Sequence, residues 1–306
     1  MYKVLVAPTT FGSITPEPID LLKNRDIEII FNDTNSVLSK TQLQKLAEEC
    51  DGVIAGTEMY DEETLNITKK LKVISRLGVG IDNIDLSVIK NKGIKLTTTS
   101  AHPAIAVAEL VIGLIIDLLR NITFSNSNIK SEIWHKQMGS LLTGKTVGVF
   151  GLGKVGKEVI RLLQPFNVDL IVNDINLDKD FLKTYGCKQS SFEDLLSFSD
   201  VLTVHINSNF GNTTLFNIKE FTKMKRSSIF INTSRGSLVN EEHLSQAIRN
   251  KLISGAALDV FNNEPYSGNL VNQNNIVLTP HIGSYAKEIR NQMEIEASKN
   301  ILSVLS

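Results

Sequence analysis

The chain has 306 residues, of which 42% are hydrophobic and 21% are charged, and its formal net charge is −1. This length predicts two domains with cores of their own. The near-neutral charge argues against a nucleic-acid-binding protein, because affinity for a phosphate backbone requires a basic surface. The two cysteines, Cys50 and Cys187, form neither a disulfide framework nor a metal-ligand spacing. We therefore expect reduced thiols, no bound metal and a cytoplasmic location.

Neither a signal peptide nor a membrane span is expected. The apolar run at the start of the chain is short and is interrupted by Pro8. The most apolar stretch, residues 104–119, contains Glu109 and Asp117 and is shorter than the ~20 residues of a spanning helix. We expect this stretch to be a buried helix of a soluble protein.

Short apolar runs alternate with helical patterns along most of the chain. In the first part, strands are expected at 3–7, 27–31, 52–56, 72–76 and 95–99, and helices at 42–49 and 86–91. The long helix over 104–120 comes next, and a polar segment then leads to Gly139. A second series of strands is expected at 146–151, 169–174, 201–206, 228–234, 255–260 and 275–281, before a last helix at about 287–305. This order predicts an α/β protein with two doubly wound parallel-sheet domains.

A glycine-rich turn, Gly151, Gly153 and Gly156 in G-x-G-x-x-G, lies between an apolar strand and an amphipathic helix. In this pattern the glycines allow a tight turn, a close approach of a pyrophosphate and close helix–strand packing. The helix N-terminus then attracts the phosphates. Asp174 ends the next strand, where its carboxylate would bind ribose hydroxyls and repel a 2′-phosphate. The turn therefore predicts NAD rather than NADP, with an ordinary βα turn as the alternative.

Three polar side chains, Arg235, Glu264 and His281, each follow a predicted strand. The carboxyl ends of parallel strands meet at one ligand-binding edge. His281 suits proton exchange with a substrate hydroxyl, and Glu264 would orient its ring and stabilise its charged form. Arg235 can bind a substrate carboxylate and polarise a carbonyl. Taken singly, each residue also fits a structural role.

At these residues the sequence resembles the D-isomer-specific 2-hydroxyacid dehydrogenase family, closest to its D-3-phosphoglycerate dehydrogenase branch. The matching stretches are 71–86, 107–115, 142–159, 231–244, 255–265 and 278–288. The resemblance implies a flavodoxin-like substrate-binding domain, residues 1–98 and 284–306, into which a Rossmann-type NAD-binding domain, residues 99–283, is inserted. It also implies a homodimer formed through the cofactor domain, and no C-terminal regulatory domain is expected.

The family's catalytic Arg, Glu and His positions fall on Arg235, Glu264 and His281. The resemblance implies cofactor contacts from Gly151, Gly153, Lys154, Val155, Gly156, Asp174, His205, Thr233, Ser234, Asp259, Gly283 and Ser284. It also implies a substrate loop, Arg76, Gly78, Val79 and Gly80, whose backbone N–H groups hold the substrate carboxylate. Two places depart from the family pattern: Thr98–Ala101 replace the usual Asn-Thr-Pro-Gly, and Asn207 replaces a proline.

These features predict NAD-dependent interconversion of a D-2-hydroxy acid and its 2-keto acid. D-3-phosphoglycerate and 3-phosphohydroxypyruvate, in serine biosynthesis, are the expected pair. A reductase of glyoxylate, hydroxypyruvate or another 2-keto acid is the alternative. A phosphorylated substrate would need cations, for which Arg76 and Lys136 are candidates. A third hypothesis comes from another functional class: the chain would be an NAD-sensing binding protein similar to the C-terminal-binding corepressors.

Overall fold

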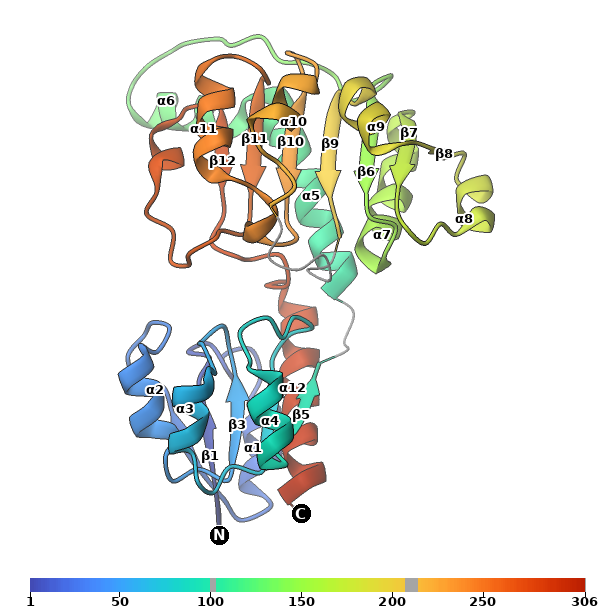
Figure 1. Ribbon diagram of the computed structural model, residues 1–306. Coiled ribbons are helices and arrows are strands. Elements are labelled where there is room, and N and C mark those ends of the chain that lie inside the picture. Colours follow the sequence, from blue (N-terminus) through green and yellow to red (C-terminus); the bar gives the residue numbers. More distant parts are fainter. Residues whose placement is uncertain (100–102, 207–213, 306) are drawn as a thin grey trace. The chain divides into compact units, whose positions relative to one another are not determined.

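A computed structural model describes residues 1–99, 103–206 and 214–305 of the chain. The chain forms two compact units, one of Met1–His102 with Tyr285–Ser306 and the other of Pro103–Ser284 (Figure 1). The boundaries predicted from sequence, 98/99 and 283/284, lie close to these. The assignment of substrate binding to the first unit stays a prediction.

The first unit contains one parallel sheet of five strands in the order β2-β1-β3-β4-β5, the flavodoxin-like order of a doubly wound fold. Its strands are β1 (Tyr2–Val6), β2 (Ile27–Phe31), β3 (Gly52–Ala55), β4 (Val73–Arg76) and β5 (Lys95–Thr98). Its helices are α1 (Glu17–Lys23), α2 (Lys40–Ala47), α3 (Glu62–Ile67), α4 (Leu86–Lys92) and α12 (Lys287–Leu305). The apolar sides of α2, α3 and α4 share a core with the sheet, while α12 packs on α1, β3 and β4.

The second unit contains a parallel sheet of seven strands in the order β12-β11-β10-β9-β6-β7-β8. This is the Rossmann order with one further strand at the β12 edge. The strands are β6 (Thr146–Phe150), β7 (Asp169–Asn173), β8 (Lys188–Gln189), β9 (Val201–Val204), β10 (Ile229–Asn232), β11 (Gly255–Leu258) and β12 (Ile276–Leu278). The helices are α5 (Pro103–Arg120), α6 (Ile122–Lys130), α7 (Lys154–Leu163), α8 (Lys179–Thr184), α9 (Phe192–Phe198), α10 (Ile218–Lys223) and α11 (Glu241–Arg249).

Helices cover both faces of this second sheet, as Figure 1 shows. One core includes residues of α5, α7 and α8, and the other includes residues of α9, α10 and α11. Because both faces are buried, the central strands are apolar without alternation. That is why β9, β10 and β11 could be recognised in the sequence as continuous apolar runs. The fold class predicted from the sequence is therefore confirmed.

α8, α9 and α10 are among the elements that the sequence did not predict. They have six or seven residues each, which leaves few positions over which a helical period can be seen. Local caps mark two of their starts, since Asp178 accepts from Phe181 N–H and Ser191 from Asp194 N–H. α6 lies in the segment that the sequence marks only as polar, and it has no buried residue.

The long apolar helix α5 belongs to the core of the second unit. Ala108, Val111 and Ile115 are fully buried in that core. Among the described residues, no helix is long and apolar enough to cross a membrane.

Candidate active site

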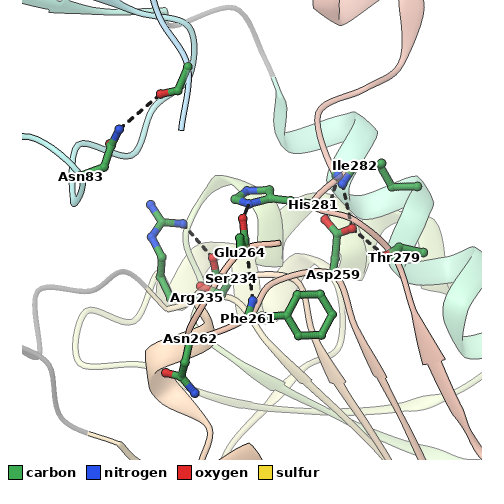
Figure 2. Close-up of polar contacts among 12 residues, drawn as sticks. Asn83, Ser234, Arg235, Asp259, Phe261, Asn262, Glu264, Thr279, His281 and Ile282 are labelled. Carbon is green, nitrogen blue, oxygen red and sulfur yellow. Dashed lines mark hydrogen bonds and ion pairs between the residues drawn. The ribbon is translucent and has the colours of Figure 1, made fainter. Parts of the chain in front are cut away.

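Three adjacent strands of the second unit bring Arg235, Glu264 and His281 to one edge of the sheet. Arg235 follows β10, Glu264 follows β11 and His281 follows β12, and these strands are neighbours in the sheet. Figure 2 shows the His281 ring directed at the Glu264 carboxylate, with Arg235 on the neighbouring turn. The sheet thus brings together the three residues that were predicted to form one site. Their catalytic roles stay predictions.

His281 and Glu264 form a hydrogen-bonded pair, with 2.8 Å between Nδ1 and Oε2. The other carboxylate oxygen, Oε1, accepts the N–H of Phe261 at 3.0 Å. Burial raises the pKa of Glu264, but the hydrogen bond and charge of His281, the Phe261 amide and the charge of Arg235 outweigh it, so the net pKa is lowered. Glu264 is therefore a charged partner for His281, and Nε2 is the ring nitrogen left for a ligand.

Asp259 fixes the turn that carries His281. Its Oδ1 accepts Thr279 Oγ1–H at 2.6 Å and Ile282 N–H at 2.8 Å, and its Oδ2 accepts Gly283 N–H at 2.8 Å. His281 itself has φ +55, a left-handed conformation that a residue other than glycine adopts at some cost. The bonds on both sides of His281 hold that conformation. Both oxygens of Asp259 thus bind the protein itself, and the predicted cofactor contact of Asp259 stays a prediction.

A buried asparagine shapes the turn that carries Arg235. Asn232 ends β10, where its Oδ1 accepts Ser234 N–H at 3.0 Å and its Nδ2 donates to the Arg235 carbonyl at 2.8 Å. The Arg235 guanidinium donates from Nη1 to the Ser234 carbonyl at 2.7 Å. This hydrogen bond fixes the direction of the guanidinium, whose planar fork has five N–H groups in all.

The glycine-rich turn has the close packing that its sequence predicts. Gly151 has φ +105, and a Cβ there would lie 2.6 Å from the His205 carbonyl carbon. A Cβ on Gly156 would lie 2.1 Å from the Gly151 carbonyl oxygen, whereas a Cβ on Gly153 would meet nothing within 4 Å. Gly153 is also the N-cap of α7 and makes no side-chain cap. Gly151 and Gly156 are thus packed against the protein, whereas there is free space beside Gly153. Exposed Lys154 and half-buried Val155 follow Gly153.

Asp174 lies beside this turn, at the end of β7. Its Oδ2 accepts Leu152 N–H at 2.5 Å and its Oδ1 accepts Asn176 N–H at 2.7 Å. A carboxylate offers about four lone-pair positions, so both oxygens keep capacity for further donors. Ile175, the next residue, leaves 78% of its surface exposed. An acidic group and an apolar surface thus lie together beside the glycines.

The other predicted cofactor-binding residues differ in whether their side chains already have hydrogen-bond partners in the protein. Thr233 Oγ1 is buried and has no hydrogen-bond partner among the described residues. Ser234 Oγ donates to the Ile206 carbonyl. The His205 ring is buried and pairs through Nε2 with Thr203 Oγ1 at 2.8 Å, and burial lowers the His205 pKa to about 3. His205 is thus a neutral core histidine whose direct cofactor contact stays a prediction, and Asn207 lies outside the described residues.

The predicted substrate loop follows β4 in the first unit. The N–H of Gly78 donates to Thr99 Oγ1 at 2.9 Å, while Val79 is 59% exposed. The N–H groups of Val79 and Gly80 donate no hydrogen bond within the described residues. Free adjacent amides suit an anionic ligand. Of the Thr98–Ala101 departure, Ser100 and Ala101 lie outside the described residues.

Comparison with known proteins decides the family. Residues 112–283 match the NAD binding domain of the D-isomer specific 2-hydroxyacid dehydrogenases. The chain belongs to this dehydrogenase family. It is 31% identical to a D-3-phosphoglycerate dehydrogenase of Archaeoglobus fulgidus over 99% of this chain and 57% of that protein.

Solved structures of the dehydrogenase family agree with the fold. A putative D-3-phosphoglycerate dehydrogenase of Ralstonia solanacearum matches with TM-score 0.90 at 27% identity, covering 100% of this chain and 94% of that one. A glyoxylate reductase of Paecilomyes thermophila matches with TM-score 0.83 at 26% identity, covering 100% and 95%. The chain spans about half the length of the curated relatives that it matches.

The described residues of this family member fit an NAD molecule. The space above Gly153, the uncapped start of α7 and the unpartnered Thr233 hydroxyl are features that a bound dinucleotide would use. The supporting residues Asn232 and Phe261, and the bonds by which Asp259 fixes the turn of His281, were not predicted from the sequence. An asparagine that ends a buried strand and precedes a turn was the available signal for Asn232, because asparagine side chains often bond the backbone two residues on.

Proposed function

We propose that this chain is an NAD-dependent dehydrogenase that interconverts a D-2-hydroxy acid and its 2-keto acid. The observation that carries the proposal is the His281–Glu264 pair beside Arg235, at the edge where β10, β11 and β12 end. Bound NAD⁺ would supply the acceptor for the hydride that leaves the C2 carbon. All other tasks in the reaction fall to side chains and amides of this chain.

In the oxidative direction, His281 acts as the general base. Its Nδ1–H donates to Glu264, which fixes the tautomer and leaves the Nε2 lone pair for the substrate hydroxyl. Nε2 takes the hydroxyl proton as hydride leaves C2, and the charge of Glu264 stabilises the resulting imidazolium. In the reductive direction, the same Nε2–H returns its proton to the carbonyl oxygen.

Arg235 binds and polarises the substrate. With Nη1 directed to the Ser234 carbonyl, the guanidinium would contact the substrate carboxylate and the C2 oxygen. The family resemblance also implies a role for the first unit, in which the Val79 and Gly80 N–H groups would receive a substrate carboxylate.

D-3-phosphoglycerate is the substrate that we propose first, because similarity along nearly the whole of this chain links it to relatives that carry this name. A glyoxylate or hydroxypyruvate reductase is the second candidate. It is favoured by the likeness to a glyoxylate reductase and by the Arg76 guanidinium, whose Nη1 donates to the Leu77 carbonyl. That guanidinium is already engaged by the loop, so a phosphate needs a further cation. Lys136 is exposed and is the candidate.

Replacing the base tests the mechanism. His281→Ala should lower kcat by about 10²–10⁴-fold, the usual contribution of general acid–base catalysis. NADH should still bind, because the glycine turn and Asp174 are unchanged. The assays are steady-state oxidation of NADH and a fluorescence titration of NADH. Near-wild-type kcat in the reductive direction would show that the proposed mechanism is wrong.

A panel of 2-keto acids tests the substrate. Oxidation of NADH is followed with 3-phosphohydroxypyruvate, glyoxylate, hydroxypyruvate and pyruvate. The highest kcat/KM with 3-phosphohydroxypyruvate would support the first candidate, and a higher value with glyoxylate or hydroxypyruvate would support the second. NADH binding without turnover of any of them would favour the NAD-sensing class.

A further inference from the structure

Asn232 is a buried polar residue to which the proposed function assigns no task. It ends β10, and none of its surface is exposed. A buried amide is costly unless its donor and acceptor groups are hydrogen-bonded. Here Oδ1 accepts Ser234 N–H at 3.0 Å, and Nδ2 donates to the Arg235 carbonyl at 2.8 Å. Both ends of the amide are therefore bonded to the short turn, residues 233–235, that carries Arg235.

Ser234 connects the Asn232 amide to the Arg235 guanidinium. The N–H of Ser234 is held by Asn232, and its hydroxyl donates to the Ile206 carbonyl after β9. Its carbonyl accepts Arg235 Nη1–H at 2.7 Å, a bond that Figure 2 shows. Ser234 is thus bonded at its N–H, its hydroxyl and its carbonyl. The direction of the guanidinium depends on where this one residue is held.

Gly236, the residue after Arg235, is held by packing instead. A Cβ on Gly236 would lie 2.0 Å from the Phe261 carbonyl carbon and 2.5 Å from the Asn262 nitrogen. The N–H of Phe261 in turn binds Glu264 Oε1 at 3.0 Å. The backbone after Arg235 therefore lies directly against the segment that holds Glu264. What remains for the Asn232 side chain to hold is residues 233–235.

The turn of His281 is held by a different side chain. Asp259 fixes that turn through its carboxylate, which accepts from residues on both sides of His281. The N–H of Asp259 donates to the Asn232 backbone carbonyl at 3.0 Å, a bond that does not involve the Asn232 side chain. The Arg235 and His281 turns thus meet at a backbone hydrogen bond, while separate side chains hold each of them.

We propose that Asn232 is a positioning residue, whose buried side chain fixes the Ser234–Arg235 turn and so directs the guanidinium at the substrate without contact to the substrate. Asp259 has the corresponding place for His281. The site then has two separately held parts, of which one binds and polarises the substrate and the other transfers the proton. This inference rests on the proposed function, because Asn232 acts through the role that Arg235 has there.

Asn232→Ala tests the proposal, because it removes both side-chain bonds to the turn. Hydrogen–deuterium exchange is measured on the full chain for peptides that cover residues 233–239 and 279–284, and kcat and KM are measured with glyoxylate and 3-phosphohydroxypyruvate. We expect faster exchange in the first peptide only. kcat/KM should fall about 10–100-fold, because a group misplaced by about 1 Å can cost that much. The acidic limb of the oxidative pH profile should stay in place, because His281 and Glu264 keep their bonds.

A double-mutant cycle with Arg235→Lys separates positioning from general destabilisation. Once residue 235 is lysine, no planar fork is left to direct, so adding Asn232→Ala should lower kcat/KM by less than about threefold. Asn232→Ser should restore part of kcat/KM, because a serine hydroxyl can bond the backbone two residues on, although more weakly. If Asn232→Ala does not fold, Asn232→Ser takes its place in the cycle.

Asn32→Ala is the matched control. Asn32 is a buried asparagine that follows β2 in the first unit. Its Oδ1 accepts Thr34 N–H at 3.0 Å, and its Nδ2 donates to the Ser36 carbonyl at 2.8 Å, so it holds a turn in the same way. Asn32→Ala should lower the melting temperature and leave the exchange of residues 233–239 unchanged. Any effect that it has on kcat/KM should multiply with that of Arg235→Lys.

Unchanged exchange of residues 233–239 in Asn232→Ala would overturn the proposal. Effects of Asn232→Ala and Arg235→Lys that multiply would also overturn it, because Asn232 would then not act through Arg235. A moved acidic limb would do the same, because the loss would then reach His281. A wild-type chain without turnover on the full panel of keto acids would instead defeat the proposed function. The exchange measurement needs no turnover, so the two failures are distinguishable.

Discussion

Glu264 joins His281 to the backbone that follows β11: Oε2 lies 2.8 Å from His281 Nδ1, and Oε1 accepts Phe261 N–H at 3.0 Å. Each carboxylate oxygen thus has a separate task. The backbone bond fixes the direction of the carboxylate, and the carboxylate fixes the imidazole. Because the net pKa of Glu264 is lowered, the carboxylate beside the His281 ring is charged near neutral pH.

Replacing Glu264 by glutamine should shift the pH profile of the reaction. In the proposed mechanism, oxidation needs neutral His281, and the Glu264 charge favours the imidazolium. Without that charge, the acidic limb of kcat/KM in the oxidative direction should move to lower pH, and kcat should fall by less than in His281→Ala. Initial rates measured across the acidic and neutral range check this. An acidic limb that stays in place would show that Glu264 only orients the ring.

Arg235→Lys should damage the enzyme although it keeps the charge. A lysine ammonium is a point donor and cannot reproduce the planar fork that binds a carboxylate. Loss of one such stabilising group typically costs about 10²–10³-fold. We expect a fall of that order in kcat/KM, shared between a higher KM and a lower kcat because the group binds and polarises the substrate.

Arg226→Lys is the control for this substitution. Arg226 is exposed and precedes β10, whereas Arg235 follows it, so the two arginines flank opposite ends of one strand. Steady-state kinetics of both variants are compared with the wild type. If both lose activity equally, or if only KM changes in Arg235→Lys, the polarising role of Arg235 is wrong.

The parts of the site that the sequence predicts are those encoded by local pattern. The glycine turn depends on three residues within one strand–turn–helix unit. Arg235, Glu264 and His281 each follow an apolar strand that can be recognised in the sequence. Glu58, by contrast, lies in the turn after β3 and is only 4% exposed. A glutamate in a polar turn is ordinarily solvent-exposed, so no local signal marks Glu58 as buried.

The same distinction applies to Asp259. Its position at the end of β11 is visible in the sequence, but its bonds to Thr279, Ile282 and Gly283 depend on the pairing of β11 with β12. The sequence therefore predicts where charged side chains emerge from the sheet. Which partners those side chains hold depends on strand register and packing.

We also expect the chain to form a homodimer through the second unit, by way of the segment that follows α6, residues 131–141. Large apolar side chains are exposed there, with Trp134 82%, Met138 94% and Leu141 70% exposed. Contiguous exposed apolar side chains commonly mark interfaces. Sedimentation velocity at micromolar concentration should give a dimer, and Trp134→Asp with Met138→Asp should give a folded monomer. A monomeric wild type would contradict this expectation.

Asp174 should determine the choice between NAD and NADP. Placing a 2′-phosphate beside this carboxylate should cost several kcal/mol, and each ~1.4 kcal/mol is tenfold, so we expect a preference of about 100-fold or more for NAD. Asp174→Asn removes the charge but leaves an amide oxygen for Leu152 N–H, and it should lower the preference about tenfold or more. Asp178→Asn is the control, because Asp178 pairs with Lys157 at 2.5 Å and should leave the preference unchanged. The ratio of kcat/KM for the two cofactors is measured for all three proteins. Equal use of NAD and NADP by the wild type would show that Asp174 does not face the ribose.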